Sequence, residues 1–262
     1  MSTLKTSPKK RTRTRRRTKL DKILSGVAPQ KQKNIRVARQ AGAPPKRRAQ
    51  DIEPIVKPKK KTGKPQYIVR DEYFYEAKRL GYRARSAFKL LEIQEKYQII
   101  HPGMKVLDIA SAPGSWLQVL VKMVWPTGVI VGVDIQKIKS FWHQNIHVFQ
   151  GDVFVTGPII EFLKKHDIVQ TDCITSDIAA HTTWQTGVDQ YRSVELNLAI
   201  LDIADIFLKK WGTLVLKVFV GEDINDLIGP IKQRYTVLHK CKPKACRERS
   251  FEEYFVCQGK KT

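Results

Sequence analysis

The sequence has no long apolar segment. No stretch approaches the roughly 18 consecutive apolar residues that a helix needs to cross a bilayer, and no signal peptide precedes the basic residues near the start of the chain. These absences argue against an integral membrane protein and against a secreted one. We expect a soluble, intracellular protein that has no membrane partner.

Cysteine is scarce as well. The four cysteines are Cys173, Cys241, Cys246 and Cys257, and no two of them form the C-x-x-C pair of a zinc or redox site. We therefore expect reduced thiols and no metal centre.

Acidic and aromatic residues are almost missing from the first 65 residues. This segment holds 22 lysine and arginine residues, 3 acidic residues and no aromatic residue, for a net charge of +19, whereas residues 66–262 carry +4. So few apolar side chains cannot offset the entropy that is lost when a chain becomes ordered. The composition predicts a disordered basic extension over 1–65 and one folded domain over 66–262.

Two roles remain open for the basic extension. A cationic segment that lies on phosphate backbones releases condensed counterions, which gives affinity for nucleic acid without sequence specificity. Clusters such as Lys46-Arg-Arg48 also serve as nuclear import signals. A mitochondrial presequence fits less well, because the segment is rich in lysine and has no amphipathic apolar stripe.

The chain also lacks the Gly-x-Gly-x-x-Gly spacing of dinucleotide-binding proteins. It has instead the segment Val106-Leu-Asp-Ile-Ala-Ser-Ala-Pro-Gly-Ser-Trp-Leu-Gln118, in which an apolar run breaks into small residues and resumes as an amphipathic segment. This pattern predicts a strand, a tight turn and a helix whose first amides face a ligand. Pro113 removes one amide donor that a pyrophosphate would use, so a nucleoside without phosphates fits better. The alternative is a plain strand-to-helix connection.

Carboxylates stand at the ends of three later apolar segments, and they are Asp134, Asp152 and Asp177. Each of them alone is explained equally well as the cap of the next helix. The carboxyl ends of parallel strands, however, meet at the one edge of a sheet where such folds bind ligands. Three carboxylates in succession after the small-residue turn therefore favour a ligand site, with Asp134 where ribose hydroxyls are bound.

The alternation of apolar patterns predicts a doubly wound α/β fold. Helices are expected at 71–80, at 86–98 with Ser86 as N-cap, between the first six strands, and over 189–210 as the longest. No helix separates the last two strands, so they should pair as a hairpin with the final strand antiparallel. The seven strands are expected at 104–109, 129–134, 146–150, 172–177, 212–219, 235–241 and 253–258.

The order of the motifs from Asp108-Ile-Ala-Ser-Ala-Pro-Gly-Ser-Trp116 to Arg249-Ser-Phe-Glu252 resembles the RrmJ/FtsJ family of S-adenosylmethionine-dependent RNA ribose 2′-O-methyltransferases. The likeness runs from about Tyr73 to Lys260. It implies a Rossmann-like class I methyltransferase fold, in which a seven-stranded, mostly parallel sheet has an antiparallel last strand and helices on both faces. S-adenosyl-L-methionine is the implied cofactor, and RNA is the implied partner.

The resemblance also implies a cofactor site. Gly114 and Trp116 are expected to touch S-adenosylmethionine. Asp134 should hold its ribose, Asp152 its adenine and Asp177 its amino acid end.

The family's catalytic tetrad is Lys-Asp-Lys-Glu, and the matching positions are Lys89, Asp177, Lys217 and Glu252. We assign Lys217 as the general base that takes the proton of the ribose hydroxyl, with Asp177 orienting it. Lys89 and Glu252 should position the ribose and its flanking phosphate. An unpaired lysine in the apolar strand around Lys217 would be costly to bury, which favours this assignment over a side chain that merely snorkels to solvent.

Three segments depart from the family pattern. Ser115 stands where a second glycine is common, and Ala110-Ser111 where Gly-Ala is frequent, but both keep the side chains small. Ile178-Ala-Ala-His181 replaces a frequent Met-Ala-Pro-Asn and predicts a loop of different shape over the methyl group.

These residues predict transfer of a methyl group from S-adenosylmethionine to a ribose 2′-hydroxyl of RNA. The short catalytic domain favours a uridine of large-subunit ribosomal RNA as the target. The alternatives are transfer RNA or messenger RNA caps, another nucleophile such as a base nitrogen or a protein side chain, and a non-catalytic RNA-binding ribosome-assembly protein. We expect a monomer in the cytoplasm, with a nuclear, nucleolar or mitochondrial location as the alternative.

Overall fold

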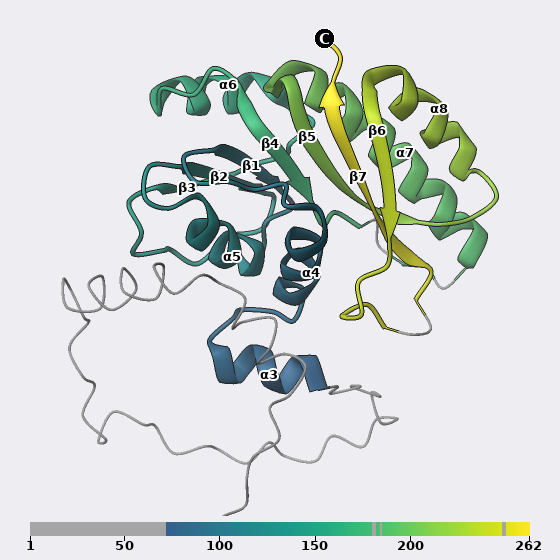
Figure 1. Cartoon of the computed structure of the whole chain (residues 1–262), viewed down its shortest axis with the longest axis horizontal. Coiled ribbons are helices and arrows are strands. Elements are labelled where there is room, and N and C mark those ends of the chain that lie inside the picture. The colour runs from purple at the N-terminus through teal and green to yellow at the C-terminus, as the bar shows by residue number, and fades with distance from the viewer. Residues whose placement is uncertain (1–71, 180–181, 184, 248–249) are drawn as a thin grey trace, which may run out of the picture. The chain divides into compact units, whose positions relative to one another are not determined.

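The computed structural model describes residues 72–262 except for 180–181, 184 and 248–249 (Figure 1). The basic extension predicted over 1–65 lies outside the described residues. So does His181, at the end of the loop that departs from the family pattern.

A single seven-stranded sheet forms the centre of the described part, in the order β3-β2-β1-β4-β5-β7-β6 (Figure 1). The first five strands pair in parallel, and β7 lies antiparallel between β5 and β6. The predicted hairpin of the last two strands and the antiparallel final strand are therefore confirmed. The strands are β1 (Lys105–Ile109), β2 (Val129–Asp134), β3 (Ile146–Gln150), β4 (Thr171–Ser176), β5 (Leu208–Phe219), β6 (Tyr235–Cys241) and β7 (Glu252–Lys260).

Helices cover both faces of this sheet, as predicted. Val131 and Val133 of β2 belong to the core that the last three helices build, whereas a Cβ atom on Gly132 would come within 2.9 Å of Leu117 in α5. Successive strand residues point to opposite faces, so α5 packs on the other side from α6, α7 and α8. The helices are α3 (Glu72–Leu80), α4 (Ala87–Tyr97), α5 (Ser115–Val124), α6 (Thr156–Lys165), α7 (Thr186–Phe207) and α8 (Ile224–Arg234).

The segment 135–145 between β2 and β3 is not helical, and the prediction of a helix in every connection between the first six strands is wrong at this place. The reason lies in a distant side chain. The Arg83 guanidinium donates hydrogen bonds to the backbone carbonyls of Lys139 and Ser140, at 2.8 Å and 2.9 Å. Ile138 is buried at the same time. The segment is thus fixed by contacts outside itself instead of by helical hydrogen bonds.

Helix α7 ends at Phe207, three residues before the predicted end, and Leu208 already begins β5. Its buried face includes the polar residues Ser193 and Asn197. The Asn197 amide donates to the Lys217 carbonyl at 2.9 Å, and the Ser193 hydroxyl accepts from the backbone of the same strand. These hydrogen bonds attach α7 to the carboxyl end of β5. A pattern that counts only apolar residues does not detect such a face.

Within the described residues, no helix combines the length and apolarity needed to cross a membrane. The four cysteines are free thiols.

Candidate active site

Strand register places Lys217 on one particular face of the sheet. Opposed residues on neighbouring strands share a face, and one such row runs through Gly132, Asp108, Thr175 and Val215. Lys217 lies two residues beyond Val215 and therefore projects from the same face. This is the face that α5 covers, because Gly132 faces Leu117 of that helix.

Strand β7 and helix α4 supply further side chains to this face. Tyr254 stands directly opposite Lys217 in the antiparallel ladder, and Glu252 lies two residues earlier on the same side of β7. Lys89 of α4 forms an ion pair with Glu252. Elements that are far apart in the sequence thus converge on one point.

The four predicted catalytic residues form one connected cluster. The Nζ atom of Lys217 lies 3.1 Å from Oδ1 of Asp177 and also donates to the Asp177 carbonyl. The Tyr254 hydroxyl is 2.6 Å from the same Oδ1 atom and 3.0 Å from Oε1 of Glu252, the carboxylate that pairs with Lys89. The structure therefore brings all four residues together, with Tyr254 as the link.

The charges of this cluster stabilise one another. Burial lowers the pKa of Lys89, but the carboxylates of Asp177 and Glu252 outweigh it and leave that pKa above its ordinary value. Burial raises the pKa of Asp177, but the two ammonium groups and the Tyr254 hydroxyl outweigh it and leave that pKa below its ordinary value. At neutral pH the Asp177 carboxylate is therefore ionised and Lys89 is protonated.

Tyr254 is a site residue that our sequence reasoning missed. Its side chain is fully buried, and burial together with the two carboxylates raises its pKa well above the ordinary value. It therefore remains a neutral hydroxyl donor. The signal that could have revealed it is the alternation on the final strand, because residues two apart share a face and Glu252 was already assigned to the site.

Gly114 forms the tight turn between β1 and α5. It is the N-cap of α5 and has a φ of 99°, a conformation that only glycine adopts without strain. A Cβ atom at this position would lie 2.8 Å from the Arg83 guanidinium and 2.8 Å from the Phe141 ring. The turn therefore requires glycine for two independent reasons.

Trp116 connects this turn to the cluster. The residue is 2% exposed, its indole N–H donates to the Ser86 carbonyl at 2.8 Å, and its ring centroid is 6.0 Å from that of Tyr254. The predicted cofactor residue and the predicted catalytic residues thus belong to one continuous site.

Ser86 stands at the predicted N-cap of α4, but its side chain makes no capping hydrogen bond, so the predicted capping role is wrong. Its hydroxyl is instead paired with the Ser115 hydroxyl at 2.8 Å. Ser115 is the residue that stands where the family commonly has glycine. This serine therefore joins the start of α4 to the start of α5.

Two of the predicted cofactor carboxylates, Asp134 and Asp152, lie in different environments. Asp134 is buried, and its oxygens accept from the backbone N–H groups of Ala112 and Gln136 at 2.8 Å and 2.7 Å. Asp152 is exposed and accepts from the Phe154 N–H at 2.9 Å, as a turn-forming aspartate does. Each carboxylate oxygen can accept a second hydrogen bond, so neither arrangement prevents contact with a ligand.

Asp108 is a second residue that the sequence reasoning did not single out. It is 1% exposed, and its Oδ1 atom accepts from the Thr175 hydroxyl at 2.6 Å. Its Oδ2 atom is buried without a hydrogen-bond partner. Burial raises the pKa of this carboxyl to about 7. This buried carboxyl at the base of the turn therefore keeps its proton up to about neutral pH.

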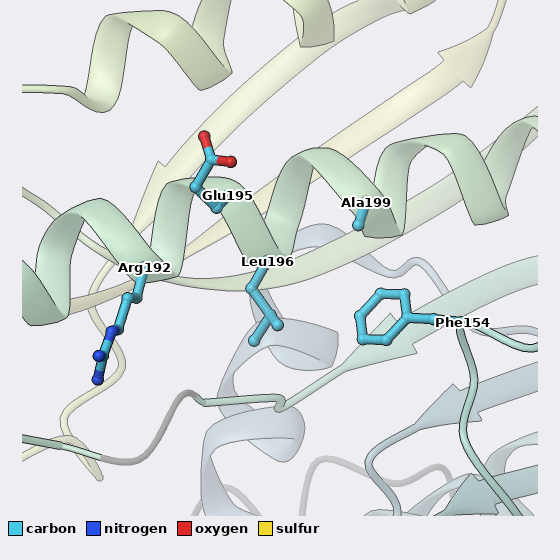
Figure 2. Close-up of a pocket in the computed structure, with 5 residues that line it drawn as sticks. All are labelled: Phe154, Arg192, Glu195, Leu196 and Ala199. Atoms are coloured by element: carbon cyan, nitrogen blue, oxygen red, sulfur yellow. The ribbon is translucent and has the colours of Figure 1, made fainter.

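Apolar side chains follow the carboxylates at this edge. Ile135 is 66% exposed and Phe154 is 43% exposed. A hollow of about 350 Å³ lies beside Phe154, and Figure 2 shows the ring directed toward the helix that carries Leu196 and Ala199. The hollow is lined by Phe154 and by four residues of α7, and none of the predicted cofactor residues lines it. It is therefore not evidence for the cofactor site.

The model of the FtsJ-like methyltransferase family matches residues 82–260 of the chain. The chain belongs to this family. The ribosomal RNA large subunit methyltransferase E of Nitratidesulfovibrio vulgaris is 39% identical over 190 residues, which are 72% of this chain and 93% of the relative. The protein of the same name from Methanocaldococcus jannaschii is 36% identical over 197 residues, which are 73% of this chain and 80% of the relative.

A solved structure agrees with the assignment to the FtsJ-like family. A crystal structure described as that of a ribosomal RNA methyltransferase from Plasmodium falciparum has a TM-score of 0.61 and 27% identity, and the match covers 68% of this chain and 98% of that one.

Membership in the FtsJ-like family confirms the predicted fold class, the methyltransferase class and S-adenosylmethionine as the cofactor. All the predicted site residues fall inside the matched range. Their individual roles remain predictions.

Proposed function

We propose that this protein transfers a methyl group from S-adenosylmethionine to a ribose 2′-hydroxyl of large-subunit ribosomal RNA, with a uridine as the target. The observation that carries the proposal is the largely buried cluster in which two lysines and two partly exposed carboxylates meet around the Tyr254 hydroxyl. The substrate class is supported by the relatives, which are named as large-subunit ribosomal RNA methyltransferases.

S-adenosylmethionine supplies an electrophilic methyl group on a positively charged sulfur. Gly114 and Trp116 would hold it at the turn, Asp134 would bind its ribose, Asp152 its adenine and Asp177 its amino acid end.

Lys217 is the general base in this proposal. Asp177 holds the Lys217 amine through its carboxylate and its carbonyl, which fixes the direction of the amine. Lys217 forms an ion pair with Asp177 in the structure, so it must first lose a proton, because only an unprotonated nitrogen can take the proton of the ribose hydroxyl. The positive charges of Lys89 and of the bound sulfonium would favour that loss. A lysine can do this, whereas a guanidinium cannot.

Lys89, Glu252 and Tyr254 position the RNA. Lys89 stays protonated, so it can contact a phosphate next to the target ribose, while Glu252 accepts a hydrogen bond from a ribose hydroxyl. Tyr254 keeps the two carboxylates at fixed positions. Most of the acceleration then comes from alignment of the hydroxyl with the methyl group.

The test is methyl transfer to large ribosomal subunits from a strain that lacks the enzyme, followed by digestion of the RNA to nucleosides and mass spectrometry. We expect a single new 2′-O-methylated uridine that depends on the wild-type enzyme. Methylation of a base, or of transfer RNA in place of ribosomal RNA, would contradict the proposal.

The proposal includes a monomer that acts in the cytoplasm. The support for the cytoplasm is that the named relatives come from a bacterium and an archaeon, whose ribosomes are assembled in that compartment. The monomer is a prediction from the sequence alone. Light scattering of the purified protein and fractionation of cells that express a tagged copy test these two statements.

A further inference from the structure

The non-helical segment 135–145 presents an exposed aromatic pair. Trp142 is 83% exposed, and its ring stacks on His143 with a centroid distance of 3.7 Å and an interplanar angle of 27°. The methyl-transfer chemistry uses neither residue. A large ring that is stacked on one side and open to solvent on the other offers a free flat face.

Arg83 attaches the segment 135–145 to the tight turn between β1 and α5, here called the cofactor turn. Its guanidinium donates to the carbonyls of Lys139 and Ser140 and, at 3.0 Å, to the carbonyl of Pro113. It also lies over the Phe141 ring, 3.8 Å from the centroid. The three residues before the aromatic pair are therefore held by side-chain and backbone contacts, which reduces the entropy that a partner must remove to order the segment.

A hollow of about 290 Å³ adjoins the pair, and its lining combines aromatic rings with positive charge. None of the described residues that line it is acidic. The aromatic and positively charged lining residues are Tyr82, Arg83, Lys122, Phe141, Trp142 and His143. Lys137 and Lys139 are exposed on the same segment. Flat rings surrounded by cations match the base and phosphate of a nucleotide, whereas an acidic peptide would leave the rings without a partner.

We infer that Trp142 and His143 form a stacking platform for one unpaired base of the substrate RNA, and that Lys122, Lys137 and Lys139 contact its phosphates. The inference rests on the proposed function, because it takes RNA to be the substrate. Single-stranded RNA is recognised mainly by stacking of splayed bases on aromatic side chains. Phe141, the residue before the platform, lies against the turn at Gly114.

The first test compares Trp142→Ala with Trp211→Ala in the full-length protein. Trp211 is a matched control, because it is 67% exposed and lies near the opposite end of β5 from Lys217. Binding is measured by fluorescence anisotropy on protein-free large-subunit ribosomal RNA, and binding of S-adenosylmethionine is measured by calorimetry. We expect Trp142→Ala to weaken RNA binding roughly 5- to 150-fold, the range for removal of one base-stacking interaction, with cofactor affinity unchanged. Trp142→Phe should retain most of the affinity.

Two outcomes would overturn the inference. Equal RNA affinity for the wild type and Trp142→Ala would show that no base stacks there. A loss of cofactor affinity in Trp142→Ala without a loss of RNA affinity would show that the segment serves the cofactor. RNA binding is measured separately from methyl transfer, so the two proposals can fail independently. If the wild-type protein binds RNA through Trp142 but methylates no ribose, the proposed function is contradicted and the stacking platform is not.

The lysines of the platform have a separate test. A Lys137→Ala, Lys139→Ala double variant should reduce the slope of log K against log[salt] by roughly 0.7 for each phosphate that is no longer bound by a lysine. The control is Lys164→Ala, Lys165→Ala in the last turn of α6. Equal slopes for the platform variant and the wild type would contradict the phosphate contacts.

Discussion

At the scale of residues, the site depends on charges that are buried together. The pairs Lys217–Asp177 and Lys89–Glu252 would each be weak contributors to stability alone, because removing a charge from water costs about as much as the pairing returns. Tyr254 joins them, since its hydroxyl lies within hydrogen-bond distance of both carboxylates. Loss of one member therefore leaves the others incompletely paired.

Replacement of Lys217 tests the assignment of the base. Lys217→Ala should lower single-turnover methyl transfer by at least about 100-fold, the usual loss when a general base is removed, and leave cofactor affinity nearly unchanged. Lys217→Arg should be equally inactive, because the guanidinium stays protonated. An active arginine variant would leave Lys217 with an electrostatic role only.

Asp108 gives the protein a pH-dependent stability. Below pH 3.8 its carboxyl is protonated in both the folded and the unfolded chain; above that value the unfolded chain releases a proton that the folded chain keeps until about pH 7. The free energy of unfolding therefore falls as the pH rises through this window, by up to about 4 kcal/mol. Asp108→Asn lacks this contribution. Denaturant unfolding of the wild type and of Asp108→Asn between pH 4 and pH 8 measures this contribution. If the free energy of unfolding changes with pH in the same way in both proteins, the prediction is contradicted.

At the scale of elements, the turn between β1 and α5 tolerates no side chain at Gly114. Gly114→Ala should destabilise the protein by about 2 kcal/mol or more, because the Cβ atom is strained at this φ and overlaps Arg83 and Phe141. It should also weaken cofactor binding. Gly157→Ala in the first turn of α6 is the control, since a Cβ atom there meets nothing within 4 Å. Thermal unfolding and calorimetry compare the two, and equal melting temperatures would contradict the prediction.

The elements also show what sequence reasoning could reach. The strands that end at Asp134 and Gln150 were located to the residue, because apolar runs bounded by turn residues are local signals. The segment 135–145 was not, because its conformation depends on Arg83, about 50 residues earlier. Tyr254 was missed although alternation on its own strand places it on the same face as Glu252. Its place opposite Lys217 follows from pairing between strands, and single-chain periodicity does not report which strands are neighbours.

At the scale of the whole molecule, positive charge is concentrated in one segment. Residues 1–65 carry a net charge of +19, and residues 66–262 carry +4. The longer segment contains the predicted catalytic and cofactor residues. The nonspecific attraction of residues 1–65 to RNA can therefore be tested separately from the methyl transfer that residues 66–262 carry out.

Deletion of residues 1–65 tests this separation. We expect weaker RNA binding and a smaller slope of log K against log[salt], by roughly 0.7 to 0.9 for each phosphate that the deleted segment had neutralised, with unchanged affinity for S-adenosylmethionine. A salt titration of both proteins on the same RNA, at saturating cofactor, is the measurement. Equal slopes would mean that the segment does not touch the substrate, and a targeting role would become the better interpretation.

The position of β7 has a consequence for synthesis. This strand lies between β5 and β6 and carries Glu252 and Tyr254, yet it is the last strand to leave the ribosome. A nascent chain can pair the five parallel strands first, since folding proceeds from the amino end during translation. Until β7 enters, β5 and β6 have open edges and the cluster lacks two members. The entry of β7 therefore completes the candidate active site and joins β5 to β6 in one late event.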